Sequence, residues 1–144
     1  ADIREEQGVT VFDLQDASKN AHSKRLVPVH PDLVKLGLLD YAASLRKRGE
    51  VRLFPDWQPE DKINRWFLRT YRRSLGLNDK RKVFHSFRHT LKTELIRTGS
   101  TKEISDLISG NEDQSVAAVY VHDVPLRRMK AALDCVDFKL PMLT

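Results

Sequence analysis

The sequence contains a single cysteine, Cys135, and none of its apolar stretches is long. One thiol excludes an internal disulfide, and a membrane-spanning helix needs roughly 18 consecutive apolar residues. The chain does not open with a basic segment followed by an apolar one, which is the pattern of a secretion signal. No group of carboxylates, cysteines or histidines has the spacing of metal ligands. These absences predict a cytoplasmic protein that requires no metal and no other cofactor.

Positive charge is in excess along the chain. Its 144 residues include 25 lysines and arginines against 20 aspartates and glutamates, which gives a formal net charge of +5. Such a balance favours a polyanionic partner such as nucleic acid. The length fits one domain with one hydrophobic core, so a single fold is expected over residues 1–144.

Two segments near the N-terminus alternate β-branched or aromatic residues with smaller or polar ones. They are GVTVFDLQ at 8–15 and KRLVPV at 24–29, and the polar stretch DASKNAHS separates them. This pattern predicts a β-hairpin over about 8–29 with a long turn. Residues 4–6 (REE), which precede it, are expected to form a charged turn.

Helical patterns fill the rest of the chain. Pro31 suits a first helical position, and leucines recur at helical spacing until Gly49, which predicts a helix over 31–48. The overall expectation is an α+β fold that is mostly helical, a hairpin followed by a helical array over about 31–136. Shorter helices are expected at 85–98, 101–109, 113–121 and 125–136, with a loose tail over 137–144.

Two of the predicted helices carry apolar faces that should be buried. In the first helix this face consists of Leu33, Leu36, Leu39, Ala43 and Leu45. A further helix opens at Pro59 and ends at Gly76, and its apolar face consists of Ile63, Trp66, Phe67, Thr70, Tyr71 and Ser74. A neighbouring face of that helix carries Arg65, Arg69, Arg72 and Arg73. These arginines either contact the DNA backbone or form a solvated helix face.

A histidine and an arginine, His85 and Arg88, stand three positions apart at the start of a predicted helix. Their side chains should project on one face beside the backbone N–H groups of the first turn, and such a face can hold a phosphate. The pair alone is weak evidence, because about half an H-x-x-R match is expected by chance at this composition. A second match, His22 with Arg25, is indeed present.

The residues around and after this pair resemble the catalytic domain of the tyrosine recombinases of the phage-integrase type. The motif HSFRHT is followed by SGNEDQSVAAVY, which places Asn111 23 residues after Arg88 and Tyr120 nine residues after Asn111. The family has a His or Trp and then its nucleophilic Tyr at these spacings. The segment SKNAHSKRLVPVHPDL also looks like the family's lysine-bearing hairpin and aligns Lys19 with that lysine. The resemblance covers nearly the whole chain.

This resemblance implies a role for each residue in breaking and rejoining DNA. Tyr120 would attack a DNA phosphate, and it needs a proton acceptor because a free phenol has a pKa of about 10. Arg88 would hold two non-bridging oxygens, and His85 would hydrogen-bond the same phosphate and accept the proton. Lys19 would protonate the departing 5′ oxygen and leave a 3′ phosphotyrosine. Because one ester is exchanged for another, the reaction needs neither ATP nor a metal.

Two features depart from the family pattern. Asn111 replaces a His or Trp, although asparagine can still donate a hydrogen bond to a phosphate or to Tyr120. The family's earlier arginine, in a G-L-R type motif, has no counterpart, so it is expected upstream of Ala1 together with a further DNA-binding domain. Loss of one preorganised hydrogen-bond donor to the transition state typically lowers the rate of catalysis by about 10² to 10³. Residues 1–144 alone are therefore not expected to cleave DNA.

The implied partners are double-stranded DNA and other recombinase protomers. The apolar stripe at the C-terminal end must be covered, and in the family the corresponding helix, 125–136 here, often docks on a neighbouring protomer. Packing within the chain is the alternative. The implied activity is site-specific integration or excision by a DNA-associated protein of bacterial, phage or mobile-element origin. The stripe consists of Leu126, Met129, Leu133 and Val136.

Two other functions remain open at this point. A type IB topoisomerase uses a related constellation to relax supercoils, but the SKRLVPVHP hairpin and the short chain favour the recombinase. A non-catalytic DNA-binding module would keep the basic helix and leave Tyr120 as an ordinary core aromatic.

Overall fold

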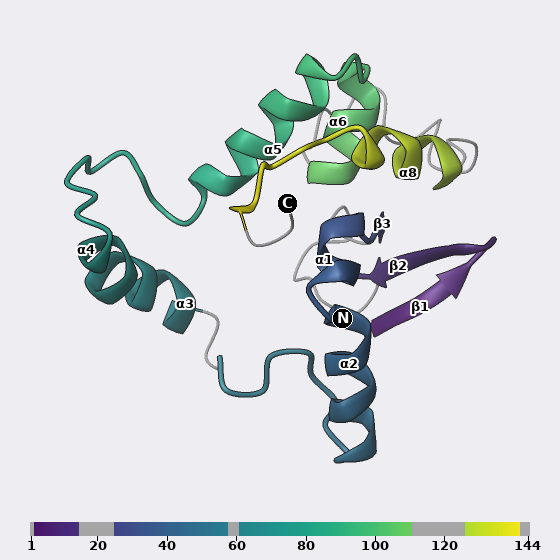
Figure 1. The fold of residues 1–144 in the computed structure, drawn as a ribbon, viewed down its shortest axis with the longest axis horizontal. Coiled ribbons are helices and arrows are strands. Elements are labelled where there is room, and N and C mark those ends of the chain that lie inside the picture. The colour runs from purple at the N-terminus through teal and green to yellow at the C-terminus, as the bar shows by residue number, and fades with distance from the viewer. Residues whose placement is uncertain (1, 15–24, 58–60, 111–125, 142–144) are drawn as a thin grey trace.

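The computed structural model describes residues 2–14, 25–57, 61–110 and 126–141. The chain has an α+β fold in which a three-stranded antiparallel sheet is followed by helices, so the expected fold class is confirmed. Helices α5, α6 and α8 lie together beside the sheet, whereas α3 and α4 lie at the far side of the molecule (Figure 1).

The sheet consists of β1 (Asp2–Glu6), β2 (Val9–Asp13) and β3 (Leu26–Pro28) in that order. Strands β2 and β3 form the predicted hairpin, and Val11 faces Pro28 in its register. Strand β1 corrects the expectation of a charged turn over 4–6. The turn lies at Gln7 and Gly8, which both have positive φ and close a tight hairpin with β2. Arg4 is held on the sheet by an ion pair with Asp13 on β2.

The predicted helix over 31–48 is two helices, α1 (Pro31–Lys35) and α2 (Leu38–Lys47). Gly37 separates them in the left-handed conformation, with φ of 84°, which a residue without a Cβ adopts easily. The break changes which residues face the core, so α2 buries Ala42 and Leu45. The expected stripe is therefore wrong except at Leu45, because it assumed one continuous helical period. Its other members, Leu33, Leu36, Leu39 and Ala43, are exposed.

The helix expected from Pro59 to Gly76 consists of α3 (Asp61–Trp66), a π-helical turn η2 (Phe67–Tyr71) and a short α4 (Arg72–Ser74). It ends at Gly76 as predicted, where φ is 63°. Of its predicted apolar face, Phe67 is buried and Ile63 is half-buried. Trp66 and Tyr71 are exposed and stack on each other with ring centroids 5.0 Å apart. The predicted burial of this face is therefore mostly wrong.

The remaining helices lie where their patterns predict them. They are α5 (Ser86–Arg97), α6 (Lys102–Ser109) and α8 (Leu126–Asp134). The Thr101 side chain accepts a hydrogen bond from the Ile104 amide and so caps α6, which ends at Gly110 in the left-handed conformation. The helix expected over 113–121 lies outside the described residues.

Helix α8 joins the two parts of the hydrophobic core. One cluster combines it with α5 and α6, and the other sets Leu126 against Val9 and Val11 of β2. The stripe predicted for this helix is thus buried within the chain, and docking on another protomer stays a prediction. The first cluster contains Leu95, Ile104, Ile108, Met129, Leu133 and Val136.

A buried histidine connects the start of α1 to the residues that follow α8. Nδ1 of His30 accepts a hydrogen bond from the backbone amide of Asp32. Nε2 of His30 donates a hydrogen bond to the carbonyl oxygen of Val136, at 3.0 Å. Phe138 packs edge-on against the His30 ring, so this part of the tail, expected to be loose, is in contact with the body. None of the helices in the described part of the chain is long and apolar enough to cross a membrane.

Candidate active site

The predicted His85 and Arg88 lie together at the start of α5. His85 is the residue before the first turn and is exposed, and Arg88 is half-buried within that turn. The first-turn amides are not available to a phosphate, which corrects one expectation. The amides of Ser86, Phe87 and Arg88 donate to the carbonyls three residues before each of them. Recognition of an anion here therefore depends on side chains.

An aromatic cluster supports the start of α5. The ring of Phe67 lies 5.8 Å from that of Phe84 and 5.6 Å from that of Phe87, each pair edge to face. Phe84 and Phe87 flank His85 in the sequence, so their packing on the buried Phe67 attaches the start of α5 to η2. The His85 ring itself contacts the ring of His89, 5.3 Å away.

Helices α5 and α6 are held against each other by a charged cluster. The carboxylate of Asp106 accepts hydrogen bonds from Lys92 on α5 and from Lys102 on its own helix, each at 2.7 Å. Burial opposes ionisation of Asp106, but the two ammonium groups outweigh it and hold the pKa of this carboxyl below its ordinary value. The pair Lys92 and Asp106 shows that α6 turns back along α5.

The end of α6 receives an arginine from the hairpin. Arg25, directly before β3, is half-buried, and its guanidinium lies 3.5 Å from the carbonyl oxygen of Ser109. A Cβ placed on Gly110 would stand 2.5 Å from Cζ of Arg25, so a glycine is required for this approach. The pKa of the Arg25 guanidinium is lowered, first by desolvation and then by the positive charge of Arg88.

Arg25 lies beside the candidate site, and sequence reasoning did not select it. The signal in the sequence is the second H-x-x-R match, His22 with Arg25, but a match of this kind is expected by chance at this composition. The pairing of β2 with β3 carries Arg25 to the end of α6 and close to Arg88. The positive charge of one match's arginine therefore acts on the arginine of the other.

Three predicted catalytic residues, Lys19, Asn111 and Tyr120, lie outside the described residues. Described residues border the segments that contain them. The Leu14 amide donates to the carbonyl of Arg25 at 3.0 Å, which brings together the two ends of the segment 15–24. Gly110, which precedes the segment 111–125, contacts the guanidinium of Arg25.

The four arginines predicted on the helix of α3 to α4 differ in environment. Arg65, Arg69 and Arg73 are exposed, whereas Arg72 is half-buried and its Nε donates to the carbonyl of Leu77 at 3.0 Å. Arg72 therefore stabilises the end of the helix by a backbone hydrogen bond. A role of these arginines in binding DNA stays a prediction.

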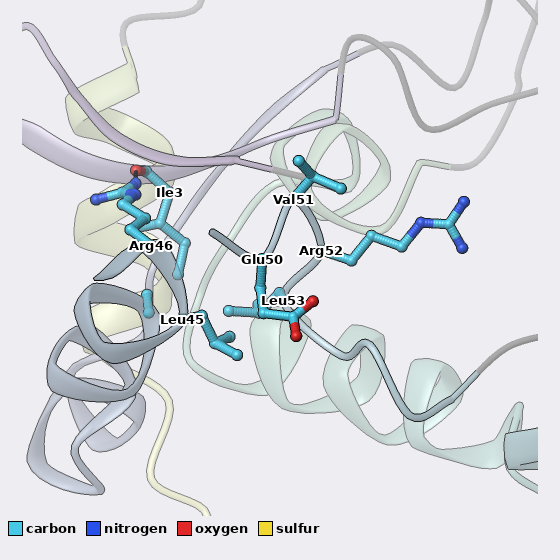
Figure 2. Close-up of a pocket in the computed structure, with 8 residues that line it drawn as sticks. Ile3, Leu45, Arg46, Glu50, Val51, Arg52 and Leu53 are labelled. Atoms are coloured by element: carbon cyan, nitrogen blue, oxygen red, sulfur yellow. Dashed lines mark hydrogen bonds between the residues drawn. The ribbon is translucent and has the colours of Figure 1, made fainter. Parts of the chain in front are cut away.

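A pocket lies elsewhere, between β1 and the C-terminal end of α2 (Figure 2). Arg46 reaches across one side of it and donates to the carbonyl of Ile3, while Arg52 points away from it. Neither of the two described catalytic candidates, His85 and Arg88, lines this pocket. Within the described ranges, no three histidines, cysteines or carboxylates gather as metal ligands would.

Comparison with known proteins adds no relative. No protein-family model, curated protein or solved structure matches this chain.

Proposed function

We propose that this chain is the catalytic part of a tyrosine recombinase, which breaks and rejoins double-stranded DNA through a 3′ phosphotyrosine formed on Tyr120. The observation that carries the proposal is the spacing of His85, Arg88, Asn111 and Tyr120 along the chain. The proposal extends to site-specific integration or excision by a DNA-associated protein of bacterial, phage or mobile-element origin.

The proximity of Arg25 and Gly110 supports this proposal, because each of them borders a segment that contains a predicted catalytic residue. Arg25 follows the segment that contains Lys19, and Gly110 precedes the segment that contains Asn111 and Tyr120. Arg25 and Gly110 are in contact, and Arg25 lies within electrostatic reach of Arg88. A site that combines a general acid, a phosphate-binding arginine and a nucleophile needs these segments to converge.

In the proposed reaction, Tyr120 attacks a phosphorus atom of the DNA backbone and His85 accepts the phenolic proton. The guanidinium of Arg88 neutralises the non-bridging oxygens, on which negative charge develops in the transition state. Lys19 donates a proton to the 5′ oxygen that leaves. The electron pair of the broken P–O bond stays on that oxygen, and attack by a 5′ hydroxyl on the phosphotyrosine later reverses the step.

Covalent capture tests the proposal. A suicide DNA substrate, whose cleaved end diffuses away, is incubated with the full-length protein that contains these residues, and adducts are resolved on a denaturing gel. The wild-type protein should form an adduct and Tyr120→Phe should form none while keeping its DNA affinity. Tyr41→Phe, which removes an exposed hydroxyl on α2, is the matched control and should form the adduct.

Three results would contradict the proposal or its expected limits. Absence of an adduct from the wild-type full-length protein leaves the non-catalytic DNA-binding module as the better assignment. An adduct formed by residues 1–144 alone refutes the expectation that the family's missing arginine is required. Relaxation of supercoiled DNA without pairing of two sites would instead identify a type IB topoisomerase.

A further inference from the structure

An array of aromatic rings connects the loop before α3, the turn η2 and the start of α5. Consecutive ring centroids in it lie 5.0 to 5.8 Å apart, in stacked, tilted or edge-to-face pairs. Such contacts hold the rings in fixed orientations relative to one another. The members of this aromatic array are Trp57, Trp66, Phe67, Tyr71, Phe84 and Phe87.

The π-helical turn η2 brings two of these rings into register. Trp66 and Tyr71 are five positions apart, and five positions of an α-helix turn by about 140° around its axis, which would separate the two side chains. The Arg72 amide instead donates to the Phe67 carbonyl, five residues earlier, so this turn is wider than an α-helical one. The rings of Trp66 and Tyr71 therefore stack, with an interplanar angle of 27°. Single π turns of this kind are frequent at functional sites.

Several rings of the aromatic array are accessible to solvent. Trp66 is 37%, Tyr71 38% and Phe87 57% exposed. Phe67 is 4% exposed, and its contacts with Tyr71 and Phe87 attach the exposed rings to the fold. The array therefore offers aromatic surface to a ligand while one of its members is anchored in the interior.

Positive charge is concentrated in the same part of the chain. Residues 61–88 contain nine of the 25 lysines and arginines and two of the 20 aspartates and glutamates, which gives this segment a formal charge of +7. Because the whole chain carries +5, the other residues together carry −2. Arg69 lies between Trp66 and Tyr71 in the sequence, Arg73 follows Tyr71, and both arginines are exposed. Aromatic rings and cationic groups thus alternate along this helix.

We propose that the aromatic array binds unpaired bases of a single-stranded nucleic acid, with Arg69 and Arg73 contacting its phosphates. Each nucleotide has one flat base and one negative charge, and proteins that bind single strands combine aromatic stacking with a basic surface. In a double helix the bases stack on one another, so the rings would find no stacking partner. A run of carboxylates on a protein would engage the arginines and offer no flat face to the rings. The site is additional to the proposed function, which concerns double-stranded DNA.

Tryptophan fluorescence of the 144-residue chain tests the inference without any substitution. Its two tryptophans, Trp57 and Trp66, both belong to the aromatic array. An oligothymidylate of about 12 nucleotides, within the usual range of single-strand binding sites, should quench their emission. An abasic oligonucleotide of the same length has the same phosphates without bases, and it should bind at least about fivefold more weakly because stacking is lost. Equal affinity for the two strands would overturn the inference.

Substitutions of Tyr71 separate stacking from apolar packing. Tyr71→Leu keeps an apolar side chain without a ring and should weaken oligothymidylate binding by at least about fivefold, whereas Tyr71→Phe keeps the ring and should bind like wild type. Tyr41→Leu is the matched control, because Tyr41 is 40% exposed and stacks on Phe54 but lies outside the basic segment 61–88. It should leave the affinity unchanged. Circular dichroism checks the fold of each variant, and the abasic strand decides the question if Tyr71→Leu does not fold.

Three further results would overturn the inference. The first is an equal loss of affinity for Tyr71→Leu and Tyr41→Leu. The second is an equal loss for a duplex and for the oligothymidylate on Tyr71→Leu, which would show that the ring does not contact unpaired bases. The third is equal quenching by a polyglutamate peptide, which would assign the array to an acidic protein partner.

An oligouridylate of the same length distinguishes the two sources of unpaired bases. Tighter binding of the oligouridylate assigns the site to RNA and tighter binding of the oligothymidylate assigns it to DNA, and either result supports contact with base faces. Covalent capture by Tyr120 uses double-stranded DNA and reports on the proposed function separately.

Discussion

The layer formed by the sheet with α5, α6 and α8 buries most of its apolar side chains, whereas α1 to α4 leave most of theirs in solvent. In the first region Leu95 is fully buried and Ile108 is 3% exposed. In the second region Leu36 is 48% and Phe54 55% exposed. Both regions have the helical spacing of apolar residues, so this spacing alone does not decide burial.

The difference between the regions is the presence of a second apolar surface. Helix α8 crosses both α6 and the sheet and covers their apolar faces. Helix α2 instead buries Ala42 and Leu45 and leaves Leu39 and Tyr41 exposed. The packed region positions Arg25 and Arg88, and the open region carries Arg65, Arg69 and Arg73, which are exposed.

The largest expected effect is a loss of stability, which should differ between variants in the packed region and variants in the open region. Leu95→Ala removes a side chain that is 0% exposed and should lower the free energy of unfolding by about 2 to 5 kcal/mol, because it leaves a cavity in the core. Leu36→Ala, at the exposed end of α1, should change it by less than about 0.5 kcal/mol. Urea unfolding followed by circular dichroism measures both. Equal losses would show that the open region is packed in solution.

A second comparison concerns DNA binding. Replacing Arg65, Arg69 and Arg73 together by Gln should reduce the slope of log affinity against log salt by up to about 2.7, if each arginine neutralises one phosphate. The control replaces Lys47, Arg48 and Arg52 by Gln, which removes the same charge from exposed positions after or at the end of α2. Equal changes in slope for the two variants would indicate a general charge effect instead of a binding face.

A smaller effect should appear where α5 meets α6. Asp106→Asn should lower the free energy of unfolding by about 1 to 2 kcal/mol near pH 7, because it removes a carboxylate that accepts hydrogen bonds from two lysines. The pKa of Asp106 is lowered on folding, so its stabilising contribution is present above its ordinary pKa and is lost as pH falls through the folded value. The difference between wild type and variant should therefore shrink below about pH 4.

The exposed pair of Lys130 and Asp134 provides the control for this pH dependence. The Asp134 side chain is 41% exposed, so solvent screens the pair and Asp134→Asn should have a smaller effect at every pH. Unfolding by urea at a series of pH values measures both variants. A constant difference for Asp106→Asn between about pH 7 and pH 3 would contradict the assignment of its carboxylate as the stabilising group.

Much of the fold was predictable because local signals were strong. Glycines and capping residues mark the ends of α5 and α6, and alternation marks β2 and β3. The failures occurred where a tertiary or turn effect overrode a pattern. Strand β1 has few apolar residues and forms because the turn at Gln7 and Gly8 pairs it with β2. The break at Gly37 changed the face that α2 buries.

The sequence by itself determined the local elements and the spacing of His85, Arg88, Asn111 and Tyr120, because each depends on residues close together or on a count along the chain. Only the tertiary structure decided that Arg25 lies against the C-terminal end of α6. That position requires the pairing of β2 with β3, the packing of α6 on α5 and a glycine at 110. Charges and hydrogen bonds act through space, so the neighbours of Arg25 depend on how the chain folds and not on spacing along the sequence.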